Sequence, residues 1–212
     1  MDKEHIQQAL LEIKKEPVRK FVQSYDLVIN LKNLEIKQTP LDFFVTLHYP
    51  KAHGVKIAAF VDQELVEQAG KLCDLTIRES DFLRYADKKV QKKLAEQYDF
   101  FIAQANLMPK IAAAFGKVLG TRGKMPNPKL GSVVPANANL QLLVEKLKKT
   151  VRLVAKKGMN LQCIVGKQDM PEEQIIDNIL TVYQTSLKQL PNETQNVRNV
   201  ILKLTMGKPV KI

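Results

Sequence analysis

Apolar positions recur in two patterns along this chain, and the pattern changes near Pro50 and again near Thr150. In the first section, residues 4–15 place apolar side chains at helical spacing. Residues 24–31 then alternate apolar and polar side chains, as a strand with one buried face does. A second alternating run follows at residues 43–47, and we expect it to pair with the first strand.

The middle section has a different character, because short apolar runs alternate there with helical patterns. The run at residues 55–61 is almost unbroken, and Asp62 is the predicted N-cap of a helix that reaches Ala69 and stops at Gly70. We expect further strands at residues 72–77 and 100–103, and further helices at residues 81–97, 107–119 and 140–149. Strands that alternate with helices at this spacing imply parallel crossovers and a Rossmann-like layer.

The last section returns to the pattern of the first. Strands are predicted at residues 151–155, 161–165 and 200–205, with a long helix over residues 171–190. Chain termini often lie close together in space. The simplest organisation is therefore an α/β protein of two domains. Residues 50–149 form one domain, inserted into another that is built from residues 1–49 and 150–212.

Composition adds a basic charge to this picture. The 212 residues include 33 Lys and Arg against 22 Asp and Glu, which gives a net charge of +11 and favours a polyanionic partner. The predicted inserted domain carries +7 of this charge (17 basic and 10 acidic residues) and the remainder +4 (16 and 12). No apolar stretch approaches the roughly 20 residues that cross a bilayer, and no signal peptide is visible at the amino terminus.

Cysteine and histidine offer little chemistry. Cys73 and Cys163 are far apart in apolar runs, as buried thiols in a reducing compartment are. The histidines lack an accompanying cysteine or carboxylate cluster, so we expect no metal and no cofactor. No catalytic group of nucleophile, base and orienting acid emerges from local spacing.

The most unusual stretch, residues 116–129, is a loop rich in glycine, proline and cations, which suits phosphate contact. It is not a nucleotide-binding P-loop. Gly120 and Gly123 are too close together, and Lys124 is followed by Met-Pro where Ser or Thr would be needed.

Within that stretch, Lys117-Val118-Leu119-Gly120-Thr121-Arg122-Gly123-Lys124-Met125-Pro126-Asn127-Pro128 resembles the signature of the ribosomal protein L-one family. Four other segments resemble the archaeal form of that family, in the family's order: residues 99–105, 134–139, 177–179 and 203–207. The resemblance implies an α+β outer domain with an RRM-like split β-α-β sheet, and an inserted Rossmann-like three-layer α/β domain. Two departures stand out, at residues 48–54 and 129–133, and the latter is more similar to the bacterial form.

The resemblance also implies a function. The protein would be a structural constituent of the large ribosomal subunit in the cytoplasm, bound to large-subunit rRNA at the stalk beside the tRNA exit site. It would assist release of deacylated exit-site tRNA and repress its own mRNA by binding an rRNA-like site in the leader. It would be a monomer outside the ribosome, with no membrane partner, and would not be an enzyme. The rival interpretation is an enzyme that binds a phosphorylated small molecule in the Rossmann-like domain.

The RNA site implied by the resemblance lies on the outer domain, at Lys20, Phe21, Ser24, Lys167, Thr205, Met206 and Gly207. Lysine can reach phosphate, the hydroxyls can bond ribose, methionine can lie against a sugar or base, and glycine lets the backbone approach closely. Taken alone, Phe21 and Met206 would more often be core residues. Secondary RNA contacts are expected at Arg122, Lys124 and Lys129, whereas the lysine pairs at residues 88–89 and 92–93 are more typical of a solvated helix face.

Overall fold

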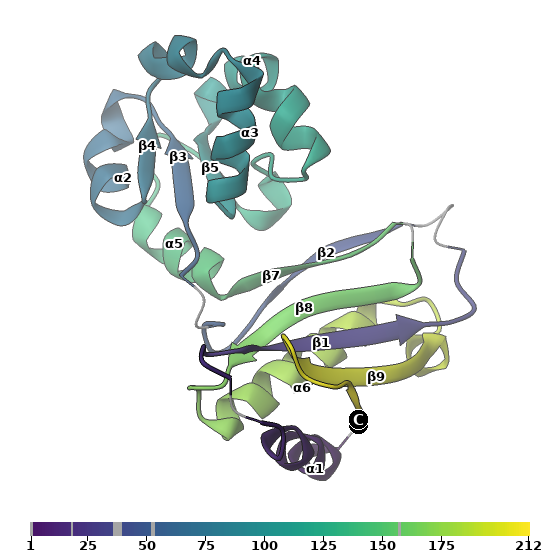
Figure 1. Ribbon diagram of the computed structural model, residues 1–212. Helices are drawn as coiled ribbons and strands as arrows, with labels where there is room; N and C mark the ends of the chain where they lie inside the picture. Colours follow the sequence, from purple (N-terminus) through teal and green to yellow (C-terminus); the bar gives the residue numbers. More distant parts are fainter. Residues whose placement is uncertain (1, 18, 36–39, 52–53, 157) are drawn as a thin grey trace. The chain divides into compact units, whose positions relative to one another are not determined.

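A computed structural model describes residues 2–17, 19–35, 40–51, 54–156 and 158–212. The chain divides into two compact units, drawn in Figure 1. We call Met1–His53 with Lys149–Ile212 the outer unit, and Gly54–Lys148 the inner unit. Helices and strands are mixed in both, so the predicted α/β class is confirmed.

The outer unit is built on a four-stranded antiparallel sheet in the order β10-β9-β1-β8. Its central strand β1 (Ser24–Leu31) comes from the start of the chain, whereas β8 (Asn160–Lys167), β9 (Val197–Leu204) and β10 (Val210–Lys211) come from the end. Side chains along β1 alternate between buried and half-buried, as the sequence pattern predicted. Neither end of the chain can complete this sheet alone.

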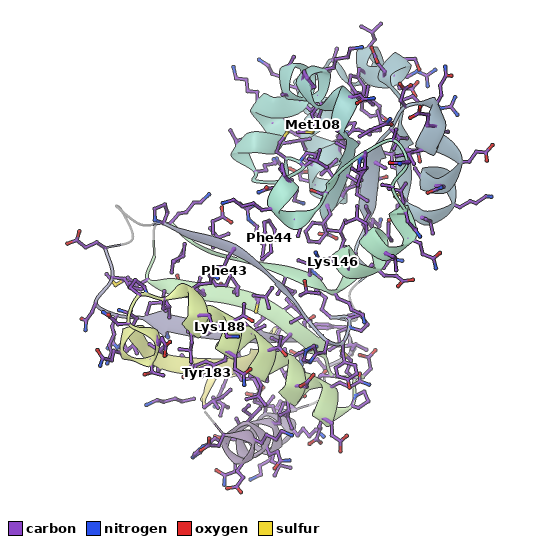
Figure 2. The ribbon with its side chains drawn as sticks, turned by 180° about the vertical axis from the view of Figure 1, so that it is seen from behind. Phe43, Phe44, Met108, Lys146, Tyr183 and Lys188 are labelled. Carbon is purple, nitrogen blue, oxygen red and sulfur yellow. The ribbon has the colours of Figure 1, made fainter. Side chains whose placement is uncertain are left out.

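The second predicted strand, β2 (Leu41–Thr46), pairs with β7 (Thr150–Ala155) and not with β1 as expected. The register matches Thr46 with Thr150, so the chain's exit from the outer unit and its return start at neighbouring points. Phe43 and Phe44 point to opposite sides of β2, and Phe43 packs against the core (Figure 2). The two-fold alternation revealed a strand but could not reveal its partner, since either pairing buries the same face.

Two helices, α1 (Lys3–Lys14) and α6 (Glu172–Gln189), cover one face of the outer sheet (Figure 1). Their buried apolar stripes share one core with the inward side chains of β1, β2, β7, β8 and β9. The first stripe contains Ile6, Leu10 and Ile13, at the spacing that predicted the helix.

The inner unit has a parallel sheet in the order β4-β3-β5-β6. Its strands are β3 (Ile57–Phe60), β4 (Leu75–Ile77), β5 (Phe100–Gln104) and β6 (Val133–Val134). Its helices are α2 (Val66–Leu72), α3 (Lys88–Gln97), α4 (Met108–Thr121) and α5 (Leu140–Lys149). Figure 1 shows α3 and α4 together on one side of this sheet and α2 on the other.

An aromatic cluster joins α4 to the inner sheet. Phe60 of β3 has its ring centroid 5.8 Å from that of Phe101 on β5 and 5.0 Å from that of Phe115 on α4. All three side chains are almost completely buried. Such ring pairs contribute roughly 0.5–1.5 kcal/mol each beyond the area they bury.

Two predicted helices of the inner unit have different bounds in the structure. Gly70 does not end its helix: α2 continues to Leu72, and β4 starts only at Leu75. Open space surrounds the Gly70 Cα, so nothing forces a turn there. The helix expected over residues 81–97 is divided into a 3-10 segment, Glu79–Tyr85, and α3, because the Asp87 carboxylate caps a new helix start by accepting the Lys89 N–H at 2.9 Å.

Short 3-10 segments also lie at Gln63–Leu65, Ala105–Leu107, Pro128–Leu130 and Glu193–Asn196. Across the ranges that the structure describes, no helix has the length and apolar character needed to cross a membrane.

Candidate RNA interface

Three strand ends meet at one end of the outer sheet. β1 begins at Ser24, while its antiparallel neighbours β8 and β9 end at Lys167 and Leu204. Ser24 is paired with Lys167 on one side, and Thr205 follows β9 on the other. The structure therefore brings Ser24, Lys167 and Thr205 together from positions up to 181 residues apart. We call these three residues and the turn that follows Thr205 the outer surface.

Two hydroxyl-bearing residues form the centre of this surface. The Ser24 N–H donates to Thr205 Oγ1 at 3.1 Å, and the Thr205 N–H donates to the Ser24 carbonyl at 3.1 Å. Thr205 Oγ1 also lies 3.4 Å from the Ser24 carbonyl, which takes its proton. Because a hydroxyl has one proton and two lone pairs, Thr205 is left with acceptor capacity for an incoming donor such as a ribose hydroxyl.

Gln23 connects this surface to the turn that carries Met206. Its side chain is buried, and its Oε1 accepts the Met206 N–H at 2.9 Å. The Gln23 N–H donates to Gln168 Oε1 at 3.1 Å, and the Gln23 carbonyl accepts the Gln168 N–H at 3.0 Å. Gln23 thus fixes the turn after β9 and the end of β8 to the start of β1.

Glu16 holds the same turn through a hydrogen bond. Its Oε1 accepts the Lys208 N–H at 2.6 Å. A Cβ at Gly207 would overlap Glu16 Oε2 and would lie 3.0 Å from the Leu204 Cβ. The close approach that Gly207 permits is therefore to the protein's own carboxylate.

Apolar side chains are exposed around this surface. Phe21 is 51% exposed, Val22 54% and Met206 65%. Neither Phe21 nor Met206 is a core residue, which removes the alternative considered for both. Three uncovered apolar groups next to Gln23 give the surface contact area that sugars and bases can use.

Lysines surround the surface, and a lysine lies close to the carboxylate of Asp26. Lys20 and Lys208 are exposed, and Lys167 is half-buried. Asp26, two residues into β1, is paired with Lys203 across the sheet. Burial raises the pKa of the Asp26 carboxyl, and the nearby Lys203 ammonium opposes that shift.

The signature loop of the inner unit is organised by bonds within the protein. Arg122 Nη2 lies 2.8 Å from Glu96 Oε1, and Lys124 Nζ donates to the Tyr98 carbonyl at 2.8 Å. Burial lowers the pKa of the Lys124 ammonium. Lys129 is exposed. Of the three secondary candidates, two are thus committed to internal partners.

Sequence reasoning missed three residues that shape the outer surface: Glu16, Gln23 and Gln168. Each acts through a single side-chain bond to a backbone N–H that is distant in sequence. The one local signal for Gln23 is its place directly before the strand predicted at residues 24–31. The other two carried none.

The carboxyl ends of the inner strands are where an enzyme of this topology would bind a phosphorylated ligand. Gln104, 1% exposed at the end of β5, occupies that place by accepting the Asp62 N–H at 2.9 Å and donating to Glu64 Oε2 at 3.2 Å. The carboxylates of Asp62 and Glu64 would repel a phosphate there.

Histidines and cysteines form no metal centre in the ranges that the structure describes. His48 Nδ1 instead lies 2.6 Å from Asp177 Oδ2, while His53 falls outside the described residues. Cys73 and Cys163 are free, and burial raises their thiol pKa to about 11 and about 12.

The fold and the charge together define a basic protein with two α/β units. The family model of the ribosomal protein L1p/L10e family matches residues 12–208. The large ribosomal subunit protein uL1 of Nanoarchaeum equitans is 39% identical over 198 residues, covering 92% of either chain. Those of Methanothermococcus thermolithotrophicus and Pyrococcus abyssi are each 38% identical, covering 100% of this chain and 99% and 96% of theirs.

This chain therefore belongs to the ribosomal protein L1p/L10e family. The resemblance seen in the sequence is confirmed. The family is one of structural ribosomal proteins, so the enzyme interpretation is set aside.

Proposed function

We propose that this protein is a constituent of the large ribosomal subunit, in the cytoplasm, and that it binds large-subunit rRNA through the outer surface described above. The single observation that carries this proposal is the meeting of Ser24, Lys167 and Thr205 at the strand ends, beside exposed Met206. Family membership supports it, because the relatives are named as large-subunit proteins.

The chemistry of the surface favours RNA over DNA. Structured RNA is recognised by its shape and its 2′-hydroxyls, and Thr205 presents an acceptor to which a 2′-hydroxyl can donate. Lys20 and Lys167 supply phosphate contacts, and Phe21 and Met206 supply apolar area. Gly207 keeps the turn close to Glu16, so that Met206 projects outward.

The proposal is tested by titrating a structured large-subunit rRNA stalk fragment with the full chain. Thr205→Val and Met206→Asp are each expected to weaken binding by at least about 1–3 kcal/mol, the order of a lost buried hydrogen bond. Wild-type affinity in both variants would contradict the assignment of this surface.

Two matched variants control the experiment. Met159 is 51% exposed at the other end of β8, where its carbonyl accepts the Leu31 N–H at 2.7 Å. Met159→Asp adds the same charge away from the site and should bind like the wild type. Thr205→Ser keeps the hydroxyl and should retain most of the affinity. Unfolding curves of all four variants separate lost contact from lost fold.

We further propose that the same surface binds a leader of the protein's own mRNA with an rRNA-like fold, and that the protein assists release of deacylated tRNA from the exit site. The support for the mRNA role is that recognition by shape requires only a shared local RNA fold. A competition experiment tests this, since a leader fragment should displace the rRNA fragment from the wild type, and Met206→Asp should weaken both equally. The protein is expected to be a monomer when free, which its sedimentation would show.

A further inference from the structure

The inner unit carries a helix whose charges are arranged at a cost to its own stability. Helix α3 begins with Lys88 and Lys89 and continues with Lys92 and Lys93, all four exposed. No acidic residue lies in its first turn. The positive end of a helix dipole is disfavoured by nearby cations, and lysines three or four residues apart repel one another.

The carboxylates closest along the helix do not compensate these lysines. Asp87 is the N-cap, where Oδ1 accepts the Lys89 N–H, so its charge acts on the end of the helix and it forms no ion pair with a lysine side chain of the face. Glu96 is held by Arg122 of the signature loop at 2.8 Å. The described residues show no ion pair to any of the four lysines, which leaves the face uncompensated.

Buried contacts on the other side of the helix leave this face outward. Gln91, buried on the opposite side, donates through Nε2 to the Tyr85 carbonyl at 2.7 Å and to the Ala114 carbonyl at 3.1 Å. Leu94 and Ala95 are buried beside it. Positions 88, 89, 92 and 93 therefore share one solvent-facing arc, and successive lysines at four-residue spacing lie about 6 Å apart along the axis.

We propose that this α3 lysine face binds the phosphate backbone of RNA as a second, sequence-independent contact of the same RNA complex. It rests on the proposed function, since RNA is the partner there. Phosphate charges would offset the mutual repulsion of the lysines. Arg122 is a positioning residue in this account, because it keeps Glu96 from neutralising Lys92 one turn away.

The test compares two double variants of the full chain in binding the rRNA stalk fragment across a salt series. Lys89→Gln with Lys93→Gln removes two cations from the face. Lys71→Gln with Lys148→Gln removes two exposed cations elsewhere on the inner unit. Each phosphate contact contributes about 0.9 to the slope of log affinity against log salt.

The α3 double variant is expected to lose about 1.8 from that slope, while the matched control keeps the wild-type slope. Between about 50 and 200 mM salt, this makes the wild type lose roughly tenfold more affinity than the α3 variant. An equal decrease in slope in both double variants would assign the effect to overall charge and overturn the proposal.

The remaining outcomes separate this inference from the proposed function. A wild type that binds RNA, with an α3 variant of unchanged slope, overturns the lysine face alone. A wild type that does not bind the fragment overturns both. The wild type and the α3 double variant are also compared in binding phosphatidylserine vesicles. If the variant loses vesicle binding but binds RNA like the wild type, the partner of the face is a membrane surface and the proposal is overturned.

Discussion

The turn after β9 offers a sharp test of how the outer surface is built, through the change Gly207→Ala. The added Cβ would overlap Glu16 Oε2 and lie 3.0 Å from the Leu204 Cβ, closer than real Cβ contacts normally are. Glu16 is the flexible partner and must move away. It then loses the bond from the Lys208 N–H, now 2.6 Å long.

The magnitude follows from that lost bond. A hydrogen bond to a charged group contributes roughly 1.5–3 kcal/mol. Glu16 is only half-buried, so water replaces part of the interaction, and we expect about 1 kcal/mol of destabilisation. RNA binding should fall as well, because the turn that loses its bond to Glu16 also carries Met206.

A double-mutant cycle with Glu16→Ala makes the reasoning refutable. Glu16→Ala alone removes the bond and also costs about 1 kcal/mol. Adding Gly207→Ala to it should then cost less than in the wild type, because the overlap with the carboxylate is gone and only the 3.0 Å contact with the Leu204 Cβ remains. Urea unfolding of the four proteins gives a coupling of about 1 kcal/mol under this account. Additive effects of the two changes would refute it.

Three further predictions concern stability. Asn178 on α6 is 0% exposed; its side chain accepts the Tyr49 N–H and donates to the Tyr49 and Val165 carbonyls. Asn178→Asp should therefore destabilise the protein by about 3–5 kcal/mol at neutral pH and by less in acid. The exposed control Asn192→Asp should have little effect in the same unfolding assay. The Arg152 guanidinium lowers the pKa of Asp42, so this pair should contribute stability at neutral pH and lose it as the pH falls below about 4; Asp42→Asn should flatten that part of the stability curve. Lys89→Gln with Lys93→Gln should raise the free energy of unfolding by about 0.5 kcal/mol, and a decrease would contradict the repulsion assigned to α3.

Local pattern was enough to predict most elements of this chain. Strand β1 and helix α5 lie at the predicted bounds, 24–31 and 140–149, because each has a clear period and a clear boundary. The errors arose where competing local signals were close in strength. Gly70 lowers helix propensity without ending a helix, and Asp87 is a cap inside a run that otherwise looks continuous.

The sequence by itself determined the periods of the elements, the excess of positive charge and the motifs that placed the chain in its family. Only the tertiary structure decided that β2 pairs with β7, that Glu16 and Gln23 support the turn at Gly207, and that Arg122 and Lys124 are occupied by internal partners. The physical reason is how far apart along the chain the interacting groups lie. A period is set by neighbours three or four residues apart, whereas each of these contacts joins groups that only the folded chain brings within a few ångströms.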